Sequence, residues 1–326
     1  MIAASGCNAK IESVPLSAYD ALRTTAAWID LSARGKILVG GEDAGRLLHA
    51  ISTNHVNGLL LHHGLYAFFL NDKGRILADA FIYHRENGFF LDTEPKSAVF
   101  LREHIDRYII ADDAYVTDEG DEWGVIGLEG PQSEKQAAKL NIPVPTTTLA
   151  TLPWEDGFVA KVASAGTHGV RIFVRVEKQQ SLLQRFKLVG IPQASAEDAH
   201  IVRLENGIPR YGEDISERYL VQETQALHAV HFTKGCYLGQ EIVERIRSRG
   251  QVHRFLTPIR LQTANIPEPG TKLVANGAPA GEITSAAYSP ALGQVVALAY
   301  LRAEVIHSKA EIALADSVPA VAVSLS

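Results

Sequence analysis

Cysteine is scarce in this chain: among 326 residues, only Cys7 and Cys236 carry a thiol. Two thiols cannot build a disulfide framework, and they cannot supply the four ligands that an iron–sulfur cluster usually requires. We therefore expect a reducing cytoplasm as the compartment, and we expect no stably bound metal or cluster.

Long apolar runs are also missing, since no stretch approaches the roughly 20 apolar residues of a membrane helix. The first residues, MIAASGCNAK, lack the basic and apolar regions of an export signal, so residues 1–15 are interpreted as a loose tail. Positive charge is in deficit, with 31 Lys and Arg against 37 Asp and Glu and a net charge of −6. Proteins dedicated to DNA usually have the opposite sign. We expect a monomer that binds neither a membrane nor DNA directly.

The body of the chain has the pattern of an α+β protein. Its length exceeds what one hydrophobic core usually supports, so two or three domains are expected. Irregular alternation of predicted strands and helices favours α+β over a regular βαβ arrangement. The predicted strands cover 36–41, 88–94, 114–118, 123–128, 157–163 and 169–177, with a hairpin turn at 71–74. The predicted helices begin after Asp43, run over 96–110 on the apolar positions Val99, Phe100, Ile105, Tyr108 and Ile109, follow Pro131, and cover 179–189 and 196–206.

Two boundaries are expected along the chain. Three prolines and three consecutive threonines in residues 141–153 predict a loop within the body. After Arg254, short β-rich runs are separated by Gly, Pro and Asn, and no helical period survives. We therefore predict an α+β body over 16–253 and a small C-terminal barrel or sandwich over 254–326.

Cys236 is the first candidate for chemistry. It lies between Gly235 and Gly239, just before a helical pattern that begins near Gln240. From Lys234 to Arg260 there are six Lys or Arg and two Glu, a local charge of +4 that leaves −10 for the rest of the chain. Cations and a helix N-terminus both stabilise a thiolate, which favours a functional thiol. A small buried hydrophobic side chain is the alternative interpretation.

The arginines after Cys236 are open to two interpretations. Glu241 and Arg245 have the i, i+4 spacing of a surface ion pair, with Ile242 and Ile246 facing the core. Further basic residues exceed what that pair uses, at Arg247, Arg249, His253 and Arg254. Such a cluster is suited to an anionic ligand, because guanidinium groups match carboxylate and phosphate geometry. A solvated basic face explains it equally.

Asp79 is the second candidate, because all the remaining residues of ILADAFIY (76–83) are apolar. Burying an ionised carboxylate costs free energy unless it is paired or hydrogen-bonded, and this marks a candidate site. An internal salt bridge or a loop cap is the structural alternative. His228 and His231 have no cysteine or acid at ligand spacing and are interpreted as structural. The sequence has no P-loop and no dinucleotide fingerprint.

The segment KGCYLGQEIVERIRSRG closely resembles the signature of the YgfZ family, which binds folate and assists iron–sulfur cluster assembly. The residues that match are Lys234, Gly235, Cys236, Tyr237, Gly239, Gln240, Glu241 and Arg245. The stretches LSARGKILVGGEDAGRLLHAISTNHVNGL, GRILADAFIY and RLENGIPRYGEDI are similar to the related glycine-cleavage T-protein, a folate-dependent aminomethyltransferase. This weaker likeness extends over about residues 25–325.

The resemblance implies a fold of three parts around a central folate-sized hole, ending in a β-barrel. It also implies that Asp79 lies beside the reactive nitrogens of tetrahydrofolate and that Glu205 holds the pterin ring. Cys236 and Asp79 are the expected catalytic residues. The folate ligands expected beside Asp79 are Glu205, Lys234, Tyr237, Gln240 and Arg245.

Three functions follow from this resemblance. The first is a factor that binds tetrahydrofolate or a one-carbon derivative and supports iron–sulfur proteins through Cys236 at the pocket edge, with an indirect link to tRNA modification. Its expected partners are the iron–sulfur assembly machinery or its client proteins. The second is a folate-dependent aminomethyltransferase, because the chain keeps Asp79. The third is a non-catalytic folate-binding scaffold.

Overall fold

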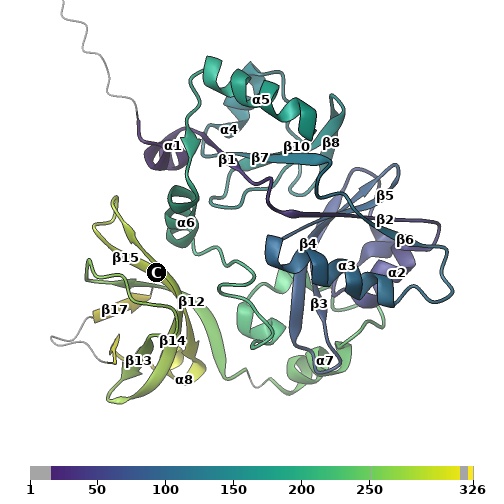
Figure 1. Cartoon of the computed structure of the whole chain (residues 1–326). Helices are drawn as coiled ribbons and strands as arrows, with labels where there is room; N and C mark the ends of the chain where they lie inside the picture. The colour runs from purple at the N-terminus through teal and green to yellow at the C-terminus, as the bar shows by residue number, and fades with distance from the viewer. Residues whose placement is uncertain (1–15, 251, 316–321, 326) are drawn as a thin grey trace, which may run out of the picture.

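A computed structural model describes residues 16–250, 252–315 and 322–325, and it contains two mixed α/β parts and a barrel (Figure 1). The expected α+β class with a C-terminal barrel is confirmed. The predicted tail over 1–15, which contains Cys7, lies outside the described residues.

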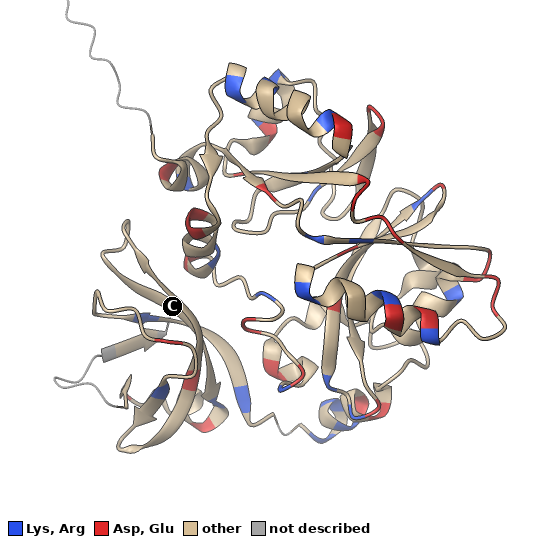
Figure 2. Ribbon diagram, in the orientation of Figure 1, with Lys and Arg blue, Asp and Glu red and all other residues tan. Residues whose placement is uncertain are grey.

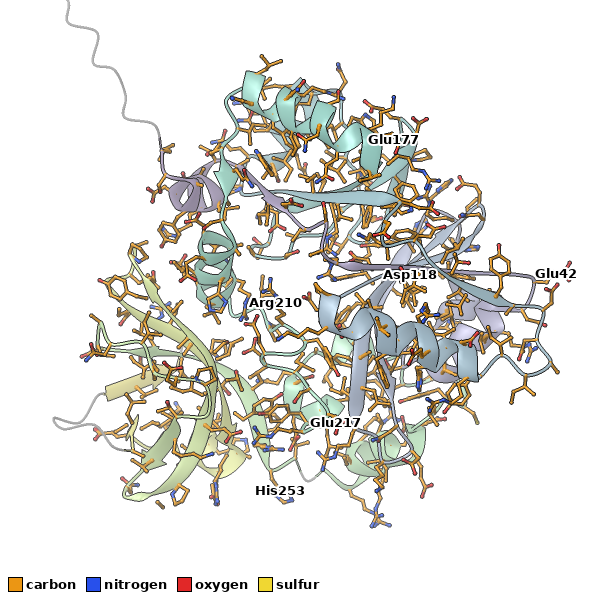
Figure 3. All side chains as sticks on the ribbon, in the orientation of Figure 1. Glu42, Asp118, Glu177, Arg210, Glu217 and His253 are labelled. Carbon is orange, nitrogen blue, oxygen red and sulfur yellow. The ribbon has the colours of Figure 1, made fainter. Side chains whose placement is uncertain are left out.

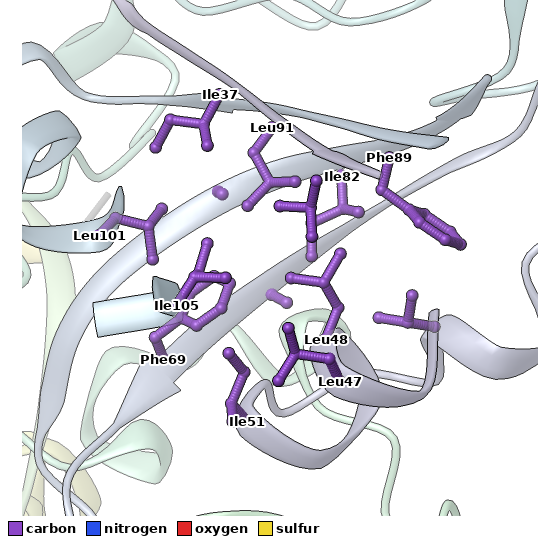
Figure 4. Packing of buried hydrophobic residues seen from close by; sticks show 14 of the residues in the cluster. Ile37, Leu47, Leu48, Ile51, Phe69, Ile82, Phe89, Leu91, Leu101 and Ile105 are labelled. Atoms are coloured by element: carbon purple, nitrogen blue, oxygen red, sulfur yellow. The ribbon is translucent and has the colours of Figure 1, made fainter. Parts of the chain in front are cut away.

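The first part is a five-stranded antiparallel sheet in the order β3-β4-β5-β2-β6. Its strands are β2 (Gly35–Gly40), β3 (Gly64–Leu70), β4 (Ile76–Arg85), β5 (Gly88–Thr93) and β6 (Tyr115–Asp118). Helices α2 (Ala44–Ile51) and α3 (Ala98–Arg107) cover one face of it. Figure 4 shows the resulting core, in which Leu48, Ile105 and Phe69 meet from the two helices and the sheet. The predicted hairpin at 71–74 joins β3 to β4.

The second part is a six-stranded sheet in the order β11-β1-β7-β10-β9-β8. Its strands are β1 (Ala27–Asp30), β7 (Trp123–Glu129), β8 (Thr151–Trp154), β9 (Gly157–Ala160), β10 (Gly169–Arg175) and β11 (Gln193–Ala194). Only the β1–β11 pair among these strands is parallel. The helices around it are α1 (Ala18–Thr24), α4 (Ser133–Lys139), α5 (Val176–Leu188) and α6 (Ala196–Glu205).

The C-terminal part is a closed six-stranded barrel. It consists of β12 (Arg254–Leu261), β13 (Lys272–Ala275), β14 (Ala278–Ser289), β15 (Gln294–Arg302), β16 (Ile312–Leu314) and β17 (Ala322–Leu325). Helix α7 (Gln240–Arg249) precedes it, and four 3-10 turns occupy Val56–Gly58, Pro95–Ser97, Val221–Thr224 and Leu227–Ala229.

Several local predictions were wrong. Strand β8 begins inside the segment predicted as a loop, and a short helix, α8 (Ala303–Ser308), interrupts the β-rich tail. In α7, Val243 is the buried residue, whereas Ile242 and Ile246 are half-buried. Each departure is short or depends on tertiary packing, which a local pattern does not report.

The buried face of α3 also differs from the prediction. Leu101 and Ile105, four positions apart, are fully buried, whereas Val99 and Phe100 are 60% and 39% exposed. At 100° per residue, Val99 and Phe100 lie well off the face of Ile105, since they are six and five positions away from it. Apolar character alone therefore misassigned them to the core.

We expect Leu101→Ala to lower the free energy of unfolding by about 2–5 kcal/mol, because it leaves a cavity in a fully packed core. Val99→Ala on the same helix should change it by about 0.5 kcal/mol or less. Urea unfolding followed by circular dichroism measures both variants. Equal losses would show that the assigned face of α3 is wrong.

Candidate functional site

A cavity of about 670 Å³ lies where the two sheets meet. The five-stranded part contributes Tyr66, Asp79 and Phe81 to its wall, and β10 of the six-stranded sheet contributes Arg171. The segment after α6 closes another side with Arg210, which Figure 3 labels between the three parts of the molecule. No described barrel residue lines this cavity. A volume of this size is typical of a small-molecule site.

Asp79 projects from β4 into the cavity wall and is 7% exposed. The Tyr66 hydroxyl donates a hydrogen bond of 2.6 Å to its Oδ2 atom, whereas Oδ1 is buried without any partner. Burial raises the pKa of the Asp79 carboxyl to about 6, although the Tyr66 hydrogen bond lowers it. A buried carboxylate oxygen without a partner, beside a cavity, is an acceptor available to an N–H or O–H group of a ligand.

A group of buried ion pairs lies next to Asp79. Asp92 on β5 accepts hydrogen bonds from Arg34, which lies just before β2, and from Arg171 on β10 of the six-stranded sheet. Arg34 also pairs with Glu94, and the guanidinium of Arg171 lies 4.9 Å from the ring centre of Phe81. Because the arginines are committed to Asp92 and Glu94, neither forms an ion pair with Asp79. The carboxylate of Asp79 is therefore left for another partner.

Aromatic rings form the wall around the Asp79 carboxyl. Tyr66 packs against Phe81 at 5.0 Å between ring centres and stacks on His228 at 5.5 Å. Burial lowers the pKa of His228, which keeps this imidazole neutral at physiological pH. This part of the wall thus combines flat apolar surfaces with the acidic acceptor of Asp79, an arrangement suited to a flat heterocycle that carries N–H groups.

The structure does not bring Glu205 to this cavity. Its carboxylate pairs with Arg23 at 2.8 Å and accepts hydrogen bonds from Tyr19 and Ser289. Glu205 lines an adjoining cavity of about 270 Å³, which shares residues 166–168 with the first. It is the last residue of α6, and there it ties α1 and barrel strand β14 to the body. Its expected contact with a pterin ring remains a prediction.

Cys236 is exposed, as the functional interpretation of this thiol requires, but it is not among the residues that line the cavity. Its loop covers the end of α2 instead. Lys234 is buried, and its Nζ atom donates a hydrogen bond of 2.5 Å to the Ser52 carbonyl. The same atom donates to the His49 carbonyl. Burial lowers the pKa of Lys234 to about 7. An ammonium group here satisfies carbonyls that have no partner within the helix.

The other residues of the motif also build the loop. The Tyr237 ring is buried in a hydrophobic cluster, and the side-chain carbonyl of Gln240 accepts a hydrogen bond from the Tyr237 backbone. Gly239 has a φ of 80°, and a Cβ atom there would lie 2.6 Å from the Asn71 carbonyl oxygen. Only glycine fits this position without strain. Lys234, Tyr237 and Gln240 therefore present Cys236, and none of them lines the cavity as a folate ligand would.

Arg245 is exposed on α7, and its side chain makes no ion pair within the described residues. The predicted pairing of Glu241 with Arg245 is not formed. Glu244 and Arg247 pair at 3.2 Å instead. Figure 2 shows acidic and basic positions together along this helix. A contact between Arg245 and a folate remains a prediction, and the helix is consistent with a solvated basic face.

Four of the cavity residues have no role predicted from the sequence, namely Tyr66, Arg34, Arg171 and Arg210, and a fifth, His228, was interpreted as structural. Arg171 could have been found, because it interrupts the apolar strand GVRIFVR just as Asp79 interrupts its own strand. The others are ordinary loop or strand residues that only the packing of distant segments brings together. Within the described residues, no group of three His, Cys, Asp or Glu side chains is arranged to hold a metal ion. No helix in this part of the chain has the length and apolar character needed to cross a membrane.

Comparison with protein families identifies two matching domains. Residues 11–234 match the GCVT N-terminal domain, and residues 254–326 match the glycine cleavage T-protein C-terminal barrel domain. Together these matches cover nearly the whole chain, with the Cys236 loop and α7 between them.

Three similar proteins are named aminomethyltransferases. The chain is 29% identical over 293 residues to an aminomethyltransferase of Rubrobacter xylanophilus, covering 88% of this chain and 78% of that protein. It is 27% identical to an aminomethyltransferase of Streptomyces coelicolor, covering 86% and 79%. A crystal structure of the glycine cleavage system aminomethyltransferase T from Bartonella henselae superposes with a TM-score of 0.85 at 19% identity. That superposition covers 94% of this chain and 86% of the other, and it confirms the T-protein-like fold.

We expect the Asp79 carboxylate to cost stability in the free protein. Because its pKa rises from 3.8 to about 6, the folded state disfavours ionisation, and wild-type stability should fall as pH rises from about 4 to 6. Asp79→Asn keeps an acceptor for Tyr66 and should be more stable than wild type at pH 8, by up to about 3 kcal/mol. Urea unfolding at pH 4.5 and 8 measures the difference. A destabilised Asp79→Asn protein at pH 8 would contradict it.

Proposed function

This chain belongs to the glycine cleavage T-protein family, and we propose that it binds a reduced folate in the Asp79 cavity and acts in aminomethyl or one-carbon transfer. The observation that carries the proposal is the partnerless Oδ1 atom of Asp79, buried in the wall of a cavity of about 670 Å³. The names of the similar proteins support the same activity.

The residues of the cavity fit a reduced pterin. An ionised carboxylate only accepts hydrogen bonds, so Asp79 is matched to N–H groups, which the reduced ring of tetrahydrofolate carries. Tyr66, with its hydroxyl on Oδ2, holds the carboxyl so that Oδ1 is the free acceptor. The rings of Phe81 and His228 flank Tyr66 and offer flat surfaces. When bound, tetrahydrofolate would supply the nitrogen atoms that accept a one-carbon unit.

The contribution of Asp79 to transfer would be electrostatic and acid–base. A carboxyl group with a pKa of about 6 is mostly ionised at neutral pH and can still take up a proton there. It can therefore hold an N–H group of the ligand or receive a proton from it. The buried pairs of Arg34 and Arg171 with Asp92 fix the wall behind it. Desolvation strengthens each of these interactions relative to water.

We expect tetrahydrofolate, under anaerobic conditions, to stabilise the protein by about 2.7 kcal/mol at a concentration of 100 times Kd. Asp79→Asn should weaken binding about 10- to 100-fold, since a hydrogen bond to a charged acceptor is lost. Wild-type affinity should also decline below about pH 6, where Asp79 becomes protonated. Calorimetric titration at pH 5 to 8 measures both effects. Asp72→Asn, at an exposed acid in the β3–β4 turn, is the control and should bind normally. A melting temperature that saturating tetrahydrofolate leaves unchanged would refute the proposal.

A second candidate function rests on the Cys236 loop. Seven other positions match the YgfZ signature, and three of them, Lys234, Tyr237 and Gln240, hold a loop that leaves the thiol exposed. This supports a role in maintaining iron–sulfur proteins, in which the thiol meets a partner protein. Membership of the YgfZ branch within the family stays a prediction carried by this motif.

Two assays separate the candidates. A transferase should release ammonia from the aminomethyl adduct of a lipoyl carrier protein when tetrahydrofolate is present. Asp79→Asn should abolish this activity, and Cys236→Ser should leave it within about twofold of wild type, because the thiol lies outside the cavity lining. The opposite pattern would favour the second candidate: no ammonia release, together with a Cys236→Ser strain that loses iron–sulfur enzyme activity.

A further inference from the structure

One segment of chain serves both the cavity and the exposed thiol. Ala226 and His228 line the cavity, and Cys236 follows eight residues after His228. The two places are distinct, since Cys236 is absent from the cavity wall. The segment between them makes specific contacts with the end of α2, and those contacts could transmit a change from one place to the other.

Thr53 and Asn54 clamp this segment to the cavity wall. The Thr53 hydroxyl donates to the Ala229 carbonyl at 2.6 Å and accepts from the Phe68 backbone at 2.9 Å. The Asn54 amide donates to the carbonyls of Tyr66 and His228 at 2.9 and 3.1 Å. Strand β3, which carries Tyr66 toward Asp79, is thus joined through the two residues after the C-cap of α2 to the segment that continues to Cys236.

Residues at and just after the end of α2 also hold the loop that carries Cys236. The Thr53 carbonyl accepts from the backbone of His231 at 3.0 Å, and the Ala50 carbonyl accepts from that of Leu238 at 3.0 Å. Lys234 donates to the carbonyl of Ser52. Residues 49–54 therefore have the cavity wall on one side and both ends of the Cys236 loop on the other.

We infer that a ligand in the Asp79 cavity stabilises the loop that presents Cys236, through the Thr53–Asn54 clamp. The inference rests on the proposed folate site. The cavity wall formed by Tyr66, Asp79 and His228 is complete only while segment 228–231 is docked, that is, hydrogen-bonded to Thr53 and Asn54. A ligand that contacts this wall therefore binds the docked state in preference to an undocked one. Linkage then requires the reverse effect: loosening the clamp must weaken ligand binding.

The consequence is a thiol whose presentation depends on the ligand. Cys236 stays exposed in either case, but a partner protein meets the docked loop more often when the cavity is filled. Docking of such a partner would then be favoured for the folate-bound protein, because the cost of ordering the loop has already been met.

Hydrogen exchange of the full-length protein, followed by mass spectrometry with and without tetrahydrofolate, tests this inference. Peptides of β4 report ligand binding itself. Peptides over 231–240 report the loop, whose His231 and Leu238 amides donate to the carbonyls of Thr53 and Ala50. At 100 times Kd, exchange in the loop should slow by up to about 100-fold if it requires undocking.

Asn54→Ala should separate the two responses. In this variant the ligand should still slow exchange in β4, although its Kd should be weaker. At the same fraction of bound protein, the slowing of exchange over 231–240 should be at least about threefold smaller than in wild type. Asn54→Asp, which keeps the shape but places an acceptor opposite two carbonyls, serves if the alanine variant folds poorly. Asn57→Ala, at an exposed position shortly after the clamp, is the matched control and should respond as wild type.

Each outcome is decisive. Protection of β4 without any change over 231–240 in the wild type would overturn the inference and leave the folate site intact. Loop protection in Asn54→Ala equal to that of wild type would overturn the clamp as the link. If tetrahydrofolate protects no part of the chain and gives no heat on titration, the proposed function itself fails.

Discussion

A buried carboxylate must be paired or hydrogen-bonded, and this requirement organises the contact between the two sheets. Asp92 of β5 lies fully buried between Arg34, just before β2, and Arg171 of β10, so the buried acid of one sheet is paired with an arginine of the other. Breaking such a cluster by removing one partner usually costs about 3–5 kcal/mol. The ion pairs thereby set the relative position of the sheets, and the cavity occupies the space beside them.

Asp79 differs from Asp92 in the one respect that matters for function. Both are buried acids on adjacent strands, but Asp92 has two arginine partners and Asp79 has a single tyrosine hydroxyl. The resulting rise in the pKa of Asp79 to about 6 is the mark of a group whose environment is incomplete. A protein keeps such a group at a cost in stability where a ligand completes the environment.

Most residues of the Cys236 motif build the loop itself. Lys234 satisfies carbonyls at the end of α2, Gly239 permits close approach to Asn71, and Gln240 fixes the turn at Tyr237. The Cys236 thiol is left exposed. The spacing of Lys234, Tyr237, Gly239 and Gln240 therefore follows from the shape of the loop. A partner that approaches this loop meets a defined backbone and a reachable sulfur atom.

The cavity and the thiol lie in different parts of this chain. The cavity lies within the matched GCVT N-terminal domain, and the exposed thiol lies in the short segment between the two matched domains. The clamp of Thr53 and Asn54 joins the two places physically. A ligand-dependent thiol and a ligand-transforming cavity are compatible in one molecule, because they use different residues.

Local sequence determined the elements and the two most unusual residues. The hairpin at 71–74, strand β2 and the β-rich tail follow from turn chemistry and apolar periodicity, which act over a few residues. Asp79 was identifiable because a charge inside an apolar strand has a cost wherever that strand is buried. Only the tertiary structure decided which residues share a cavity. It placed Arg171 and His228 beside Asp79, and it gave Glu205 to Arg23 and Ser289. It also placed the ammonium group of Lys234 on carbonyls at the end of α2. Those partners lie more than a hundred residues away and are chosen by packing, on which local spacing carries no information.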